Sequence, residues 1–132
     1  MLDTFEKGFF LGLLTGEGHF GGDGRKAQVT LRMHTRHDKL FYWLTEKFPG
    51  SKLYGPYNHG GRHYFQWMAR GEVLKNEILP IVFKNWDVID DYVQGRITEM
   101  CTRYKLITGE LESQQGNKEE ASQDKEPDTI AE

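Results

Sequence analysis

Cysteine and long apolar runs are both scarce in this chain of 132 residues. Cys101 is the single cysteine, so no disulfide can form within the chain, and such usage is typical of a reducing compartment. We expect Cys101 to be a small buried hydrophobe. No apolar run approaches the roughly 18 residues that span a bilayer. Because Asp3, Glu6 and Lys7 precede the longest run, we expect neither a secretory signal nor a membrane partner.

Charge is unevenly placed along the chain, whose formal net charge is −3. Residues 110–132 hold eight acids and two lysines, whereas residues 19–70 hold nine Lys or Arg, three acids and all five histidines. A basic middle beside an acidic end is a candidate footprint for a polyanion. The alternative is an ordinary solvated surface.

The C-terminal end has almost no large apolar residue. Such a segment cannot bury enough surface to offset the entropy of ordering. We therefore expect one domain over residues 1–112 and a disordered acidic tail over residues 113–132.

Apolar spacing divides the remaining chain into helices and hairpins. Alternation of apolar and polar residues is typical of half-buried strands, and glycine pairs between them are typical of hairpin turns. Pro80 is expected to interrupt or end the third helix. The last helix should turn Ile89, Tyr92 or Val93, Ile97 and Met100 inward. The expected elements are a helix at 4–17, strands at 19–21 and about 25–34, a helix at 38–48, strands at 51–57 and 62–70, and helices at 72–83 and about 86–111.

This order predicts an α+β domain with four antiparallel strands and helices on one face of the sheet. The other face would be open and polar. Its side chains are of the types that read base edges in the DNA major groove, although any antiparallel sheet has one polar face. The predicted DNA-binding residues on or beside this face are Arg25, Lys26, Gln28, Thr30, Arg32, Lys52, Tyr54, Arg62, Tyr64, Gln66 and Arg70, with His34 at its end.

Three glycines form a stripe on the first helix. Gly8, Gly12 and Gly16 lie at about 0°, 40° and 80° around the helix, and each costs about 1 kcal/mol relative to alanine. Close approach of another helix backbone would compensate, and the simplest partner is the same helix of a second copy across a two-fold axis. An intrachain neighbour such as the last helix is the alternative. The predicted dimer interface is Gly8, Leu11, Gly12, Thr15 and Gly16, with Phe5, Phe9, Leu13 and Leu14 expected to pack on the sheet.

The first helix ends in an acid, Glu17, where the helix dipole does not favour negative charge. If two helices pair at their glycine faces, two copies of Glu17 approach each other and need a cation. Oxygen ligands with open water positions suit Mg²⁺. Two carboxylates, a hard cation and a DNA groove would make a site for phosphodiester hydrolysis.

The stretch "FLGLLTGEG", residues 10–18, resembles the signature of the LAGLIDADG homing endonucleases. The signature's two fixed glycines fall on Gly12 and Gly18, and its acid falls on Glu17. The order of elements resembles that family over about residues 5–110, although Thr15 stands where an aspartate is common. The resemblance implies the order α-β-β-α-β-β-α-α, a saddle-shaped sheet in the major groove and, with one motif per chain, a homodimer.

The resemblance also implies roles for individual residues. Glu17 would bind the catalytic metal, with the backbone carbonyl of Gly16 as a further ligand. His34 or Thr35, and Lys39, would lie around the nucleophilic water, and the family's later lysine is best matched by Lys84.

The implied function is that of a homodimeric, Mg²⁺-dependent, intron-encoded endonuclease that cuts double-stranded DNA at a pseudo-palindrome of about 20 base pairs, estimated at about 3.4 Å per residue and per base pair. It would act inside the cell, in the cytoplasm of a bacterium or phage, or in an organelle if an organelle intron encodes it. The alternatives are an RNA maturase, a DNA-binding regulator without cleavage, and a dimerisation module without nucleic acid.

Overall fold

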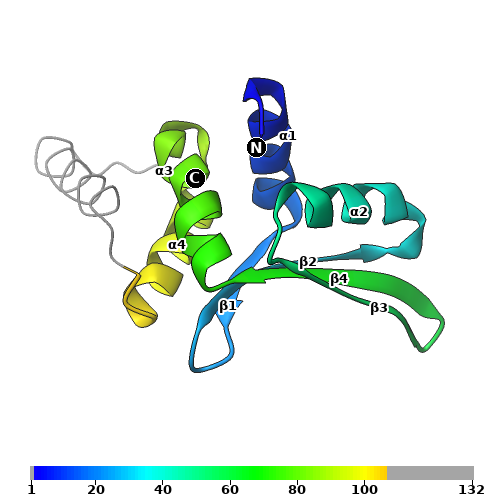
Figure 1. Ribbon diagram of the computed structural model, residues 1–132. Coiled ribbons are helices and arrows are strands. Elements are labelled where there is room, and N and C mark those ends of the chain that lie inside the picture. The colour runs from blue at the N-terminus through cyan, green and yellow to red at the C-terminus, as the bar shows by residue number, and fades with distance from the viewer. Residues whose placement is uncertain (1, 107–132) are drawn as a thin grey trace, which may run out of the picture.

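The computed structural model describes residues 2–106, so the expected tail and the end of the predicted last helix lie outside the described residues. The elements follow the predicted order, with short helical turns between some of them (Figure 1). They are α1 (Thr4–Glu17), β1 (His19–Gly22), β2 (Ala27–His34), η1 (Thr35–His37), α2 (Asp38–Lys47), β3 (Lys52–His59), β4 (Arg62–Arg70), η2 (Leu74–Ile78), α3 (Leu79–Lys84), η3 (Trp86–Val88) and α4 (Asp91–Arg103).

The four strands form one antiparallel sheet in the order β1-β2-β4-β3. The helices lie on one side of this sheet, and both of its turns bend away from them, so that the other side is open and concave (Figure 1). The α+β class and the saddle are thus as predicted. None of the helices within residues 2–106 is long and apolar enough to cross a membrane.

Helix α1 begins and ends at well-defined caps. Asp3 and Glu6 form a capping box, with the Glu6 N–H donating to Asp3 Oδ1 at 2.8 Å and the Asp3 N–H donating to Glu6 Oε1 at 3.0 Å. At the other end the Gly18 N–H donates to the Leu14 carbonyl at 2.8 Å. A capping box satisfies donors that the first turn would otherwise leave unpaired. The predicted bounds of this helix are confirmed.

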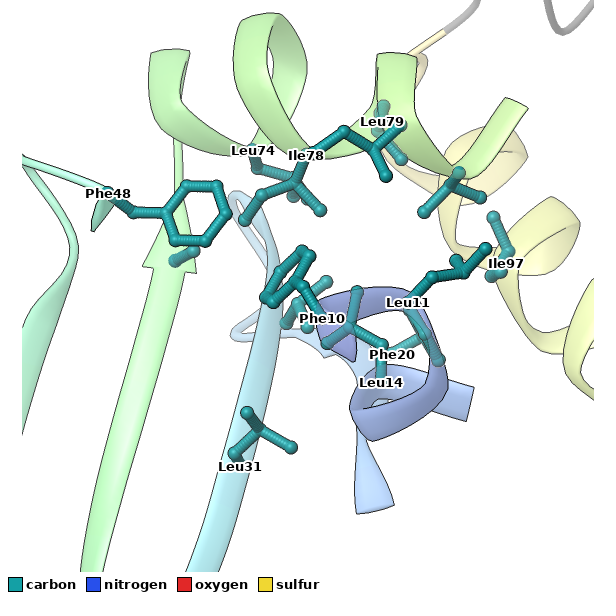
Figure 2. Packing of buried hydrophobic residues seen from close by; sticks show 14 of the residues in the cluster. Phe10, Leu11, Leu14, Phe20, Leu31, Phe48, Leu74, Ile78, Leu79 and Ile97 are labelled. Carbon is teal, nitrogen blue, oxygen red and sulfur yellow. The ribbon is translucent and has the colours of Figure 1, made fainter. Parts of the chain in front are cut away.

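The buried face of α1 consists of Phe10, Leu11 and Leu14, which point into the core in Figure 2. The prediction that Phe5 and Phe9 pack on the sheet is wrong, because they are 79% and 47% exposed. At about 100° per residue Phe5 lies within the arc of the glycine stripe and Phe9 beside it. Leu14 is buried as expected, and Leu13 is only half-buried.

Strand β2 alternates as predicted, with Val29 and Leu31 fully buried. It begins two residues later than expected. Asp23 Oδ1 accepts the backbone N–H groups of Arg25 and Lys26, both at 2.9 Å. These bonds hold both residues in the β1–β2 turn, so the prediction that they belong to the strand is wrong.

Strand β3 contains a bulge that sequence alternation does not predict. Tyr54 pairs with Gln66, but the next matched pair is Tyr57 with Tyr64. Gly55, with φ +106°, adopts the left-handed conformation that the bulge needs. The extra residue brings Tyr57 to the face on which Tyr54 lies.

The last two helices differ in detail from expectation. Pro80 lies in the first turn of α3, directly after a π-helical turn, so it interrupts the helix as predicted. The final helix begins at Asp91, five residues later than expected, because Asp90 Oδ1 accepts the Val93 N–H at 2.9 Å and caps it. It ends at Arg103, and Lys105 has a left-handed φ of 60°. The residues predicted to face inward are confirmed, because Ile89, Val93, Ile97 and Met100 are all buried. Of the two alternatives at the second position, Val93 is buried and Tyr92 is exposed.

Candidate functional site

The open face of the sheet carries cations, and no strand contributes a carboxylate to it. None of the four strands contains Asp or Glu, and all 12 acids of the described chain lie in helices, caps or turns. The strand cations all lie on this open face. Its side chains, in matched register, are His19 on β1; Gln28, Thr30, Arg32 and His34 on β2; Arg62, Tyr64, Gln66, Met68 and Arg70 on β4; and Lys52, Tyr54, Tyr57 and His59 on β3.

Arg32 is held in place at the middle of this face. Its Nε and Nη2 both donate to Gln66 Oε1, at 3.1 and 2.7 Å. Its guanidinium also lies over the Tyr64 ring, 5.3 Å from the ring centre. A guanidinium fixed in this way loses little further entropy when it binds a base edge or a phosphate.

The β1–β2 end of the face is partly neutralised. Arg70 Nη1 donates to Asp23 Oδ2 at 2.8 Å. Backbone hydrogen bonds from Lys26 and Arg25, and the nearby Arg70, hold the pKa of Asp23 below its ordinary value. Among residues 2–106 no ion pair is formed by Arg25 or Lys26, so the turn presents both as further cations at this end.

Glu17 is the last residue of α1 and is exposed. Within residues 2–106 no hydrogen bond or ion pair is made by its carboxylate. Because β1 starts at His19 opposite Thr30, Glu17 lies at the β1 edge of the sheet, close to the middle of β2. An unpartnered carboxylate at this edge is free to take a cation. Gly16, beside it, is also exposed.

The glycine stripe on α1 is uncovered. A Cβ built on Gly8, Gly12 or Gly16 meets no atom within 4 Å, so the intrachain alternative is wrong for the described residues. Leu11 is only 8% exposed and belongs to the core, so its prediction as an interface residue is also wrong. Thr15 is half-buried, and its hydroxyl donates to the Leu11 carbonyl at 2.8 Å.

The predicted catalytic residues are less gathered than expected. His34 Nδ1 accepts the Arg36 N–H at 2.9 Å, and Thr35 follows it half-buried in η1. Burial, then the charges of Arg36 and two neighbouring histidines, lower the pKa of His34.

Lys39 and Lys84 lie on helices. Lys39 lines a groove of about 580 Å³ between α2 and the first half of α1. Phe9, in that groove, is about 12 Å along the helix axis from Glu17 at 1.5 Å per residue, so the structure does not support Lys39 beside the carboxylate. Lys84 is the exposed last residue of α3, which contacts α1.

The Cys101 thiol is a possible nucleophile only if it can lose its proton. Burial raises the pKa of the Cys101 thiol to about 11, so the thiol is protonated at neutral pH and is not a nucleophile.

In the described part of the chain no three His, Cys, Asp or Glu side chains gather to hold a metal. A Mg²⁺ ion at Glu17 would therefore need ligands from outside residues 2–106, which fits an ion bound by one or two carboxylates together with phosphate oxygens.

Sequence reasoning missed Tyr57 and His59 on the open face, because the bulge reverses the alternation after Tyr54. The Gly55–Pro56 pair within the strand was the available signal, since both residues are typical of bulges. His19 and Met68 were also missed, and both follow directly from the strand register.

No protein-family model matches the sequence, and no curated protein matches it. Solved structures do share the fold. A structure titled as the group I intron-encoded homing endonuclease I-CeuI complexed with DNA has a TM-score of 0.65 at 14% identity, over 94% of this chain and 60% of that one. The archaeal intron-encoded homing endonuclease I-Vdi141I, also complexed with DNA, has a TM-score of 0.61 at 10% identity, over 97% and 89%.

The fold is thus one found in DNA endonucleases. A third structure, titled as the LAGLIDADG homing endonuclease I-GzeII in complex with its DNA target, has a TM-score of 0.52 at 14% identity, over 83% of this chain and 46% of that one. The chain has the fold of the LAGLIDADG homing endonucleases. This chain spans 60% of the I-CeuI chain. It spans 46% of the chain in another matching structure, which is titled as the K262A mutant of I-SmaMI.

Proposed function

We propose that the chain is a site-specific endonuclease that cuts double-stranded DNA as a homodimer. One observation supports this most directly: within residues 2–106 the glycine stripe of α1 is uncovered, and it ends in an unpartnered Glu17 at the edge of a concave face that carries cations and no strand carboxylate. Pairing of two stripes would bring two such carboxylates together between two open faces.

The DNA would lie on the concave face. Arg32 is the best-placed base contact because Gln66 and Tyr64 already fix it, and Arg25 and Lys26 would reach the outer phosphates from their turn. Strand β2 has eight residues, or about 27 Å at about 3.4 Å per residue. That length follows about eight base pairs per copy, so the target of a dimer would be about 16 base pairs long rather than 20.

Mg²⁺ is proposed as the cofactor. The oxygen ligands from this chain would be the Glu17 carboxylate and the Gly16 carbonyl, with the second copy and the scissile phosphates supplying others. When bound, such an ion stabilises the charge that develops on a phosphate and lowers the pKa of bound water. His34 and Thr35 would orient the attacking water, and Lys84 would stabilise negative charge.

The substitution Glu17→Gln tests this function. It keeps the size of the side chain and removes the negative charge. We expect target DNA to bind about as tightly as to the unmodified chain, while cleavage falls by several orders of magnitude, since the ion supplies several kcal/mol of charge stabilisation. Binding is measured by gel shift in Ca²⁺ and cleavage in Mg²⁺, on DNA selected from a random library.

The matched control is Glu46→Gln, because Glu46 is an exposed acid near the C-terminal end of a different helix, α2. It should leave both assays unchanged. Cleavage by the Glu17 variant at near the unmodified rate would refute the proposed site. Selective DNA binding without cleavage by the unmodified chain would instead identify a DNA-binding regulator.

A further inference from the structure

Aromatic rings cluster on the open face near the β3–β4 turn. The Tyr57 and Tyr64 rings lie 5.3 Å apart, and the His59 ring stacks 6.0 Å from that of Tyr64 at 29°. Tyr54 lies one pair further along β3, opposite Gln66. Tyr54 and Tyr57 are 39% and 38% exposed, so part of each ring is open to a ligand.

The β3 bulge is what creates this cluster. Without the extra residue, strict alternation after Tyr54 would bring Pro56 and Asn58 to the open face and turn Tyr57 toward the helices. The bulge requires a residue without a Cβ at position 55, because a Cβ on Gly55 would lie 3.0 Å from the Tyr64 carbonyl oxygen. Bulges often re-aim side chains at functional sites.

The surroundings favour an anionic ligand that has flat groups. Arg32 covers one part of the Tyr64 ring, and Arg62 pairs with His59 across the hairpin. No strand residue contributes a carboxylate. Cations beside exposed rings are the combination that binds nucleotides through both phosphate and base.

We propose that the cluster of Tyr54, Tyr57, His59 and Tyr64 is a stacking platform for unpaired nucleotides, so that the open face binds single-stranded RNA or DNA in addition to the duplex. In a duplex the faces of the bases are already stacked on each other, and only their edges reach a sheet. Unpaired bases can stack on exposed rings instead, and an aromatic four-stranded sheet takes two or three of them. This activity goes beyond the proposed cleavage and does not require it.

The test measures fluorescence anisotropy with the full chain in EDTA. The probes are labelled ten-nucleotide oligouridine, oligothymidine and an unrelated duplex of the same length. Tyr57→Ala should weaken binding of at least one single strand by about 5- to 150-fold, the range for one stacked base. Its effect on the duplex should stay within about threefold, because phosphate contacts dominate non-specific duplex binding.

Two further variants separate stacking from folding. Tyr57→Phe keeps the ring and should retain most of the single-strand affinity. Tyr92→Ala removes a ring that is 76% exposed on α4 and should change nothing. Circular dichroism verifies that all three variants fold.

The inference is overturned if the unmodified chain does not bind single strands, or if Tyr57→Ala weakens single-strand and duplex binding equally. A chain that cuts duplex DNA but ignores single strands refutes this inference alone. A chain that binds single strands but never cuts refutes only the proposed cleavage. Comparing oligouridine with oligothymidine shows which single strand is preferred.

Discussion

Replacement of Gly12 by alanine should change two measured quantities in opposite directions. Among residues 2–106 of one chain, the added methyl group meets no atom within 4 Å. Alanine is favoured over glycine in a helix interior by about 1 kcal/mol. The free energy of unfolding of the isolated chain should therefore rise by about 1 kcal/mol, which corresponds to about 4–5 °C in Tm for a domain of this size.

The dimer should respond in the other direction. If two α1 helices approach each other at the glycine stripe, each added methyl group lies where the partner backbone must pass. Overpacking of a close contact costs about 1–3 kcal/mol. The dissociation constant of the dimer should then rise by about 5- to 150-fold.

Sedimentation velocity over a concentration series measures the dimer, and urea unfolding at the lowest concentration measures the isolated chain. Gly95→Ala is the matched control, because Gly95 is also helical and its Cβ would meet no atom of the described chain within 4 Å, but it lies on α4. It should stabilise the chain similarly and leave association unchanged. If the Gly12 and Gly95 variants associate equally well, the stripe is not an interface and the reasoning is refuted.

Three further outcomes are expected. Arg32→Ala should weaken binding of target DNA by about 1–3 kcal/mol in gel shifts, whereas Arg70→Ala should weaken it less, because Arg70 is already paired with Asp23. Ser51→Ala should lower the free energy of unfolding by about 1–3 kcal/mol in urea titrations, because the buried Trp67 Nε1 donates to Ser51 Oγ at 2.9 Å and would lose its acceptor. The lowered pKa of His34 means that the unfolded chain takes up this proton first. Stability should therefore be full above the ordinary pKa of 6.5 and decline as the pH falls through 6.5 toward the lowered value, and His34→Gln should reduce the decline in urea midpoints between pH 7.5 and pH 5.5.

The fold was predictable where one period held over a whole element. The alternation that buries Val29 and Leu31 and the helical spacing before Glu17 both specify which face is inside. Glycine pairs correctly predicted the positions of the turns in both hairpins. The errors arose where a single side chain decided a boundary: Asp23 delays the start of β2, and Asp90 delays the start of α4.

The candidate site was less predictable, because it depends on which face of a helix or strand each side chain occupies and not only on where the helices and strands lie. At about 100° per residue Phe5 falls within the arc of the glycine stripe, so its apolar character alone does not place it on the sheet side of α1. Leu11 lies between glycines in sequence, yet it faces the core. The β3 bulge was signalled only by Gly55 and Pro56, and their effect on Tyr57 requires the register.

The sequence of α1 is not one that maximises the stability of a single chain. Its three stripe glycines each cost about 1 kcal/mol relative to alanine, and none of them is needed for space within the described chain. An acid at a helix C-terminus costs a further few tenths to about 1 kcal/mol, and no described partner compensates Glu17. Together this is about 3–4 kcal/mol in a domain whose total stability is about 5–15 kcal/mol. A helix with this composition is explained if its free face and its last side chain gain their stabilising contacts from outside the described residues. In the proposed dimer the glycine face would gain a close-packed neighbour, and the two Glu17 carboxylates would share the cation that each lacks within residues 2–106.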